Sequence, residues 1–423
     1  MDNNKRLRWF HESRFGIYIH YGLYSLLERG EWSMYSERIP PKEYAVLAER
    51  FLPQPNCADQ WADTIARAGA KYAVLTTRHH DGFCLFDSKF SKFSTTQTAA
   101  GRDLVAEYVT ALRRAGLKVG LYYSLLDWRF PGYFEPKKFP ESKDALLEQV
   151  HGQVRELMSN YGTIDLLEYD GGWDAKAKTD RESWVAFWRS RELNAMVRSL
   201  QPQIIINNRS GADEDIDTPE QMVKASASGR CWETCMTIGD STGWGYVRHN
   251  PNLKTVPQLL QNLCIAAQGE GNLLLNVGPE PDGRIRPEEQ QRLLAIGAWL
   301  KDNGESIRSS QRCELIGSSV VGEVNLNLQG GWTRRDNIGY WQIFRWPGSV
   351  ATQILVDTPV RKVTLLANGE EFPFKQDPDT GKLTIFNLPI NPPSPYVNVL
   401  RVEFSECPRR KAEPDLAAWL TQQ

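Results

Sequence analysis

The sequence lacks several features that would assign it to common classes of protein. Its formal net charge is only −2 over 423 residues, so it has no basic excess for binding nucleic acid or an anionic membrane. No apolar run approaches the length of a membrane span. No G-x-G-x-x-G motif follows the first predicted strand, which argues against dinucleotide binding. We therefore expect neither a nucleic-acid nor a membrane partner.

Cysteine is scarce and irregularly spaced. The seven residues include one close pair, Cys231 and Cys235, and no second Cys or His pair completes a zinc site. Reduced thiols in a cytoplasmic protein are the simpler interpretation. The N-terminal residues carry charge but no apolar segment typical of a signal peptide. We therefore expect a cytoplasmic location, with a secreted protein whose leader was removed as the alternative.

The chain is long enough for more than one domain. Within residues 1–308, short apolar runs typical of parallel strands buried on both faces alternate with amphipathic helical stretches. Strands are expected at 15–20, 72–77, 118–124, 164–169, 203–207 and 272–277, with a weaker candidate at 231–236. Helices are expected at 59–68, 103–115, 142–160, 181–199, 256–267 and 287–302. These repeats predict a (β/α)8-like TIM barrel, with a doubly wound sheet as the alternative.

The pattern changes after residue 308. Runs of β-forming residues at 340–346, 351–356, 362–366, 382–386 and 397–404 are separated by Gly, Pro, Asn and Asp. We predict an antiparallel β-sandwich domain over residues 309–407. Residues 408–423 form a tail that either frays or ends in a short helix at 416–420.

Polar side chains follow the predicted strands of the first domain. His20, the pair His79 and His80, Asp170, and Arg209 each lie at or just beyond the end of a strand. In a barrel these strand ends share one rim, so the side chains would converge. That convergence predicts an enzyme.

Asp170 ends the fourth predicted strand and is followed by two glycines, which let backbone or ligand approach closely. We interpret it as a nucleophile or base, and the alternative is a carboxylate that caps the turn. Arg209 is able to bind substrate oxygens or to keep a carboxylate ionised, and a structural ion pair is the alternative.

The two adjacent histidines have two interpretations. His79, His80 and Asp81 contain metal-ligating groups, but adjacent side chains on a strand point to opposite faces unless the chain turns sharply. Two neutral imidazoles at a rim are instead suited to adjacent sugar hydroxyls. We therefore expect no metal.

Glycoside hydrolysis requires a second carboxyl group, and the sequence offers several. They are Asp213, Glu214, Asp215, Asp217, Glu220 and Glu233. The residues alone do not choose among them. The 14 tryptophans suit a protein that stacks aromatic rings on sugar faces, although a large aromatic core would also explain them.

Several ordered segments resemble glycoside hydrolase family 29, the α-L-fucosidases. The segments are FGIYIHYGLYS at 15–25, EW at 31–32, AKYAVLTTRHHDGF at 70–83, GLYYS at 120–124 with DW at 127–128, DTPE at 217–220, WETC at 232–235 with WGY at 244–246, and GNLLLNVGP at 271–279 with DG at 282–283. They span the first domain, and the second domain agrees with the family only in its architecture.

The resemblance implies a retaining exo-α-L-fucosidase that removes terminal fucose from fucosylated glycans by double displacement and needs no metal or organic cofactor. It implies Asp170 as nucleophile and Glu220 as acid/base, with Glu233 as the other candidate. The fucose-binding residues that it implies are His20, Glu31, Trp32, His79, His80, Tyr122 and Arg209.

The chain departs from the family pattern at Glu168, where the family usually has Trp. By strand alternation Glu168 points the same way as Asp170, toward the barrel interior or rim, so we expect it to contact substrate or to perturb a pKa. The alternatives are a carbohydrate-binding protein on an inactive barrel, a glycosidase for related galactosides, and a metal-dependent hydrolase. A homo-oligomer remains one option for the assembly.

Overall fold

The computed structural model of the protein describes residues 3–173, 180–225, 229–239, 243–315 and 330–412. The chain divides into two compact units, Met1–Lys254 with Asn272–Gly297, and Thr255–Gly271 with Ala298–Gln423. The helix expected at 416–420 lies outside the described residues. Within the described ranges, no helix combines the length and the apolar character that crossing a membrane would take.

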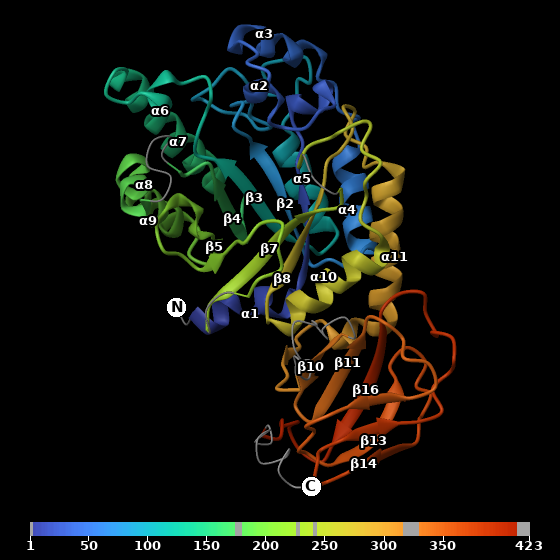
Figure 1. The fold of residues 1–423 in the computed structure, drawn as a ribbon. Coiled ribbons are helices and arrows are strands. Elements are labelled where there is room, and N and C mark those ends of the chain that lie inside the picture. The colour runs from blue at the N-terminus through green and yellow to red at the C-terminus, as the bar shows by residue number, and fades with distance from the viewer. Residues whose placement is uncertain (1–2, 174–179, 226–228, 240–242, 316–329, 413–423) are drawn as a thin grey trace. The chain divides into compact units, whose positions relative to one another are not determined.

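The first unit contains a sheet of eight strands in the order β5-β4-β3-β2-β1-β8-β7-β6 (Figure 1). All of its strand pairs are parallel. A single parallel bridge between Asn207 and Ile216 joins the two ends of the sheet and nearly closes it. The strands are β1 (Phe15–Ile19), β2 (Tyr72–Arg78), β3 (Lys118–Ser124), β4 (Leu166–Asp170), β5 (Ile205–Ile206), β6 (Ile216–Asp217), β7 (Cys231–Thr237) and β8 (Asn272–Val277). The predicted barrel is therefore confirmed.

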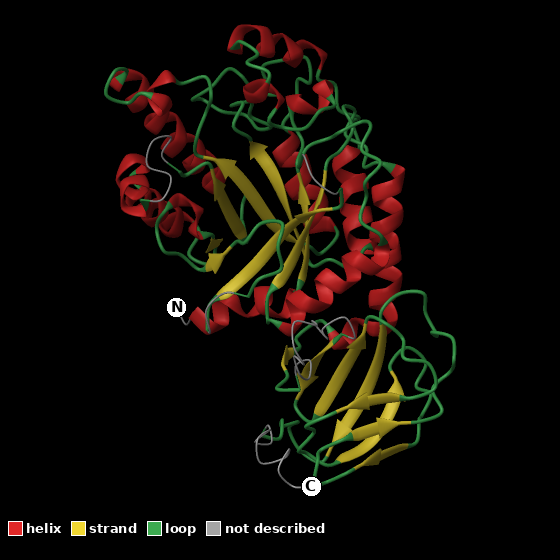
Figure 2. Cartoon of the chain, in the orientation of Figure 1, coloured by secondary structure: helices red, strands yellow, loops and turns green. Residues whose placement is uncertain are grey.

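The strands are apolar because both of their faces are covered. Every residue of β1, β2, β7 and β8 is buried. One face fills the barrel interior and the other packs on helices, as parallel strands require. Figure 2 shows the strands of this unit at its centre, with helices on the outside.

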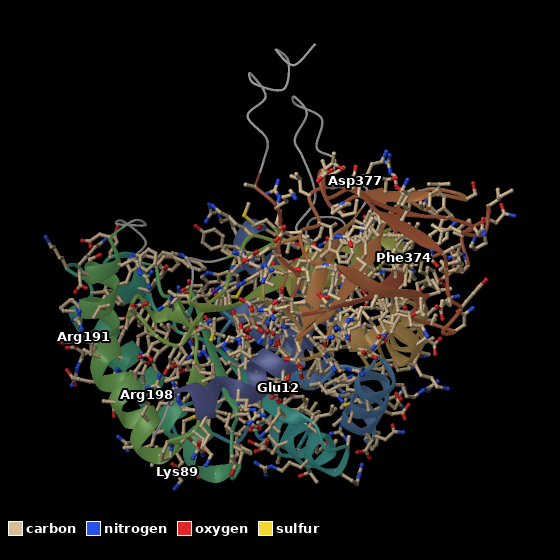
Figure 3. The ribbon with its side chains drawn as sticks, turned by 90° about the horizontal axis from the view of Figure 1, so that it is seen from below. Glu12, Lys89, Arg191, Arg198, Phe374 and Asp377 are labelled. Carbon is tan, nitrogen blue, oxygen red and sulfur yellow. The ribbon has the colours of Figure 1, made fainter. Side chains whose placement is uncertain are left out.

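The helices that follow the strands of this unit are α4 (Cys57–Arg67), α5 (Leu104–Arg114), α7 (Pro140–Asn160), α8 (Arg181–Trp188) and α9 (Ser190–Leu200). The chain begins with α1 (Asn3–Ser13), and α10 (Val256–Gln268) and α11 (Pro287–Asn303) follow β7 and β8 in sequence. Local signals set several ends. The Asp103 side chain accepts a hydrogen bond from Ala106 N and caps α5, which contributes about 1 kcal/mol. Lys89 and Arg191 project from the outer surface of the unit (Figure 3).

The single helix expected at 181–199 is two helices in the structure. Arg189 adopts a left-handed conformation with φ 52° and separates α8 from α9. The indole of Trp188 donates a hydrogen bond to Gly172 O at 2.7 Å, and Ser190 Oγ donates one to Ser210 O at 2.7 Å. These contacts attach the break to the loops after β4 and β5. Helical periodicity does not contain that tertiary constraint.

Four barrel strands differ from expectation. The strand expected at 203–207 is reduced to Ile205–Ile206, and the two-residue β6 has no apolar run that would predict it. The weak candidate at 231–236 is the fully buried seven-residue β7. The fourth strand runs to Asp170, so this carboxylate ends β4 itself.

The second unit contains two antiparallel sheets, in the orders β13-β16-β11-β10-β9 and β12-β15-β14, which confirms the predicted sandwich class. The strands are β9 (Gln311–Arg312), β10 (Gly331–Arg335), β11 (Ile338–Ile343), β12 (Ala351–Gln353), β13 (Val360–Leu365), β14 (Phe374–Gln376), β15 (Leu383–Ile385) and β16 (Asn398–Phe404). Trp332 and Trp341 stack in its core with ring centroids 5.3 Å apart. The labelled Phe374 and Asp377 lie in this unit (Figure 3).

Candidate active site

A cavity of about 130 Å³ opens where the barrel strands end. His20 follows β1, His79 and His80 follow β2, Asp170 ends β4, and Arg209 follows β5. The structure therefore brings together side chains that are far apart in the sequence. The lining residues are Tyr18, His20, Trp32, His79, His80, Tyr122, Asp170, Trp173, Arg209, Glu220, Cys235 and Trp244.

Asp170 is surrounded by hydrogen-bond donors. Tyr122 Oη donates to its Oδ2 at 3.0 Å and Arg209 Nη1 donates to its Oδ1 at 3.1 Å, while His80 Nε2, at 3.6 Å from Oδ2, lies beyond hydrogen-bond distance. Burial by itself would raise the pKa of Asp170, but the Arg209 charge and the other donors outweigh burial and hold the pKa below its usual range. Asp170 is therefore an ionised carboxylate at neutral pH.

Arg209 connects two carboxylates. Its Nη1 contacts Asp170, and its Nη2 lies 3.1 Å from Oε2 of Glu220. Its Nε donates to Thr218 Oγ1 at 2.8 Å, which fixes the orientation of the guanidinium plane. One planar cation thus holds Asp170 and Glu220 close to each other.

The three histidines of the cavity are neutral. Burial lowers the pKa of His20 to about 3 and that of His80 to about 4, and burial also lowers the pKa of His79 well below its usual value. His20 Nδ1 lies 2.6 Å from Asn276 Oδ1, and His80 Nδ1 lies 2.6 Å from Ser124 Oγ. Because Asn276 Oδ1 and Ser124 Oγ accept the Nδ1 hydrogens, the Nε2 atom of each of these two rings is left as an acceptor for a hydroxyl group.

His79 and His80 both face the cavity although they are adjacent in sequence. Their ring centroids are 4.1 Å apart, and the His79 ring stacks on Tyr122 at 5.7 Å. The pairing of β2 with β3 shifts register between Thr76 and Arg78, and the chain turns just after His79. Adjacent side chains of a regular strand would point to opposite faces, and this irregularity at the strand end lets both rings face the cavity. The described residues contain no group of three or more His, Cys, Asp or Glu side chains arranged to hold a metal ion.

Two residues expected to bind substrate do not line the cavity. Glu31 is buried, and its Oε2 accepts hydrogen bonds from Trp244 N at 2.7 Å and Gly245 N at 2.8 Å. It therefore positions Trp244, which does line the cavity. Glu168 points into the barrel interior, where its side chain is buried, rather than to the rim.

Glu168 is hydrogen-bonded to Glu233, the other candidate for the acid/base. Glu233 is fully buried, and its Oε2 accepts a hydrogen bond from Tyr72 Oη at 2.6 Å. Burial raises the pKa of Glu233 to about 7 and raises the pKa of Glu168 well above its usual value. Neither carboxyl group is among the residues that line the cavity, whereas Glu220 is.

Four lining residues were not assigned from the sequence. They are Tyr18, Trp173, Cys235 and Trp244. Tyr18 precedes His20 by two positions, so strand alternation alone would have predicted a shared face. Trp244 lies in a loop after β7, and no local pattern predicts that such a loop folds back on the rim.

Comparisons with known proteins agree on one family. A family model described as Alpha-L-fucosidase matches residues 1–305. The tissue alpha-L-fucosidase of Rattus norvegicus is 31% identical over 94% of this chain and 88% of its own length. The tissue alpha-L-fucosidase of Homo sapiens is 29% identical over 93% of this chain and 87% of its own length.

Solved structures give the same result. Alpha-L-fucosidase isoenzyme 1 from Paenibacillus thiaminolyticus has a TM-score of 0.83 and 33% identity, and the match covers 96% of this chain and 100% of that one. A GH29 alpha-L-fucosidase from Bacteroides thetaiotaomicron, solved as a trapped covalent intermediate with 2-fluoro-fucosyl fluoride, has a TM-score of 0.82 and 26% identity. That match covers 95% of this chain and 96% of the Bacteroides chain.

Proposed function

The chain belongs to the α-L-fucosidase family of retaining glycoside hydrolases, and we propose that Asp170 is its nucleophile and Glu220 its general acid and base. The observation that carries this proposal is the guanidinium of Arg209, which contacts both carboxylates at 3.1 Å. Retaining glycosidases need two carboxyl groups roughly 5–5.5 Å apart, and a shared guanidinium keeps them close.

The reaction would proceed in two displacements. Asp170 attacks the anomeric carbon of fucose, forming an ester bond while the bond to the leaving oxygen breaks. Glu220 donates its proton to that oxygen. A water molecule then attacks the same carbon, Glu220 takes the proton of the water, and the Asp170 ester is cleaved to release fucose.

The burial of the two carboxylates supports this division of roles. The Asp170 side chain is 14% exposed and the Glu220 side chain is 45% exposed. Glu220 therefore lies nearer the mouth, where the leaving group departs. Asp170 stays ionised because of its donors, as a nucleophile requires.

The cavity supports recognition of one terminal sugar. Its volume of about 130 Å³ is below the roughly 300–1,000 Å³ typical of drug-sized ligands. The indoles of Trp32, Trp173 and Trp244 offer flat walls to the apolar face and methyl group of fucose. The neutral imidazoles of His20 and His80 offer hydrogen bonds to its hydroxyls. We propose exo-cleavage of fucosylated oligosaccharides or glycoconjugates.

The nucleophile is tested by Asp170→Gly. We expect turnover of para-nitrophenyl α-L-fucoside to fall on the order of 10⁴-fold or more, because covalent catalysis is lost. Azide, which fits the space left by the carboxylate, should restore part of the rate and give a glycosyl azide of inverted configuration. An undiminished rate in this variant would remove Asp170 from the mechanism. Wild-type protein without activity on any fucoside would favour a binding protein instead.

The acid/base is tested by Glu220→Ala beside two controls. We expect substrates with poor leaving groups to slow roughly 10²–10⁴-fold, whereas activated aryl fucosides slow much less, because only poor leaving groups need the proton. Asp213→Ala removes a carboxylate that is 81% exposed and should leave both substrates unaffected. If Glu233→Gln instead shows the leaving-group dependence, the assignment to Glu220 fails.

A further inference from the structure

Two buried side chains that do not line the catalytic cavity hold two of its histidine rings. Asn276 lies on β8 and Ser124 ends β3. Asn276 Oδ1 lies 2.6 Å from Nδ1 of His20, and Ser124 Oγ lies 2.6 Å from Nδ1 of His80. A neutral imidazole carries its hydrogen on only one nitrogen, and the partner of one nitrogen decides what the other nitrogen offers. These two contacts therefore set the polarity that each ring shows to a ligand.

The amide of Asn276 has one orientation that satisfies both of its neighbours. Its Nδ2 donates a hydrogen bond to Trp244 O at 2.7 Å, and a carbonyl oxygen can only accept. Turning the amide over would place two acceptor oxygens at that short distance. Oδ1 therefore faces His20 and accepts from it, so the hydrogen of His20 lies on Nδ1.

The hydroxyl group of Ser124 is committed in the same way. It donates its only hydrogen to Leu126 O at 2.7 Å, so its oxygen can only accept from Nδ1 of His80. Nε2 of His80 then carries a lone pair, and the nearest atom of Asp170, Oδ2, is also an acceptor and lies 3.6 Å away. Two acceptors that face the same space suit a ligand that brings the hydrogen itself.

The third histidine of the cavity has the opposite arrangement. Nδ1 of His79 is buried and has no hydrogen-bond partner among the residues that the structure describes. A hydrogen on Nδ1 would be a buried N–H group without an acceptor, which is rare in proteins. The hydrogen of His79 therefore belongs on Nε2. The rings that line one cavity thus differ in polarity, and the difference follows from their partners.

We propose that Asn276 and Ser124 are positioning residues that determine sugar specificity by holding His20 and His80 as hydrogen-bond acceptors toward the ligand. Each of these two rings then requires a sugar hydroxyl group that donates, and it discriminates against a substituent that cannot. The proposal rests on the proposed fucosidase activity and deepens it. Asn276 and Ser124 act through the rings and take no part in bond making or breaking.

The first experiment reads the tautomers in the wild-type protein. Histidine labelled with nitrogen-15 is observed by long-range proton–nitrogen correlation NMR, and single His→Gln variants assign the three rings. We expect a hydrogen on Nδ1 of His20 and of His80 and, in the same spectrum, on Nε2 of His79. A hydrogen on Nε2 of His20 or His80 would overturn the proposal without any further variant.

The second experiment removes one partner at a time. In Ser124→Ala the ring of His80 loses its acceptor, so its hydrogen should move to Nε2, where Asp170 accepts it, while His20 keeps its tautomer. Ser124→Thr retains the hydroxyl group and should retain the wild-type tautomer. A wild-type tautomer of His80 in Ser124→Ala would mean that Ser124 does not set it.

Asn276→Leu should have the converse effect, because it removes the acceptor of His20 and leaves that of His80. The control is Ser13→Ala. Ser13 is also buried in this unit, and its hydroxyl group donates to Trp9 O at 2.6 Å. Its loss should change neither ring.

The third experiment measures what the rings require of the sugar. Titration calorimetry gives dissociation constants for L-fucose and for analogues in which one ring hydroxyl group is replaced by hydrogen or by fluorine, which cannot donate. At two positions the fluorine analogue should bind about five- to tenfold more weakly than L-fucose and no more tightly than the deoxy analogue, as expected for one lost hydrogen bond. The penalty for fluorine should disappear at one of these positions in Ser124→Ala and at the other in Asn276→Leu.

Two binding results would contradict the proposal. Equal weakening of L-fucose and all of its analogues in both variants would mean a merely structural role for Asn276 and Ser124. Fluorine analogues that bind the wild-type protein as tightly as L-fucose at every position would mean that no hydroxyl group is required as a donor. Wild-type protein that has the expected tautomers but neither binds L-fucose nor cleaves para-nitrophenyl α-L-fucoside would instead refute the proposed function.

Discussion

Glu168→Gln should change how stability depends on pH. Glu168 on β4 is 2% exposed, Glu233 on β7 is 0% exposed, and the two carboxyl groups are hydrogen-bonded to each other inside the barrel. A bond between two carboxyl groups requires a proton on one of them. Burial raises the pKa of both residues, that of Glu233 to about 7. The folded pair therefore keeps a proton that the unfolded chain has lost.

The size of the effect follows from proton linkage. An unfolded glutamate titrates near pH 4.5, so between that pH and the raised folded pKa values the folded pair binds more protons than the unfolded chain does. The stability that the pair contributes is fully present below pH 4.5. It is lost as the pH rises above that value, by about 1.4 kcal/mol per pH unit for each extra proton that the folded state binds. Glu168→Gln removes one of the two buried carboxyl groups that titrate, while its carboxamide still offers Glu233 a hydrogen-bond donor. The variant should lose less stability over this window than the wild type.

The assay is the Tm of the barrel unit measured by calorimetry from about pH 5 to about pH 7. Each kcal/mol of stability corresponds to roughly 2–4 °C in Tm. The Tm of Glu168→Gln relative to that of the wild type should therefore be several degrees higher at about pH 7 than at about pH 5. Burial also raises the pKa of Glu289 to about 7. Glu289 is present in both proteins, so its contribution to the pH dependence cancels when the two are compared. Glu182→Gln, a change at a side chain that is 75% exposed, serves as the control and should show no pH-dependent difference. Parallel Tm curves for wild type and Glu168→Gln would refute the shared proton.

Three further outcomes are expected. In Gly172→Ala the new Cβ would lie 2.0 Å from Arg209 O, so the loop after β4 must shift, and both kcat, by at least about tenfold, and Tm should fall, as steady-state kinetics and calorimetry would show. Tyr122→Phe removes a donor to Asp170, whose pKa should rise, so the acidic limb of the kcat/KM profile should move to higher pH; an unmoved limb would contradict this. Asp127 is fully buried, and although burial alone would raise its pKa, two arginines lower it to about 2. The stability from its ion pairs is therefore fully present above pH 3.8 and is lost as the pH falls toward 2. Asp127→Asn should lower the free energy of unfolding by about 3–5 kcal/mol at neutral pH and by less at pH 3, as measured by denaturant titration.

Much of the barrel was predictable because its strands are buried on both faces. A nearly continuous apolar run such as 72–77 leaves few alternatives to a parallel strand, and Asp103 and Gly116 signal where α5 begins and ends. The predictions failed where a segment is held by distant partners. Arg189 interrupts a helix because its neighbours bind two loops, and β6 exists because two residues pair with β7.

The candidate site shows the same division. Strand ends and motif order were enough to select Asp170, the histidine pair and Arg209, because the carboxyl ends of parallel strands must meet at one rim. The resemblance favoured Glu220 as the acid/base, with Glu233 as the other candidate. The fold places the two differently, since Glu220 contacts Arg209 at the cavity and Glu233 is buried against Tyr72.

The sequence by itself determined the family, the barrel and sandwich classes, and the residue types at the rim, because these depend on local periodicity and on motifs. The tertiary structure decided which side chains share a cavity and which carboxyl groups are buried together. Those properties depend on distances between residues that are far apart in the chain and on burial from water. Glu168 illustrates the difference, because its place on a strand was predictable but its pairing with a carboxyl group 65 residues later was not.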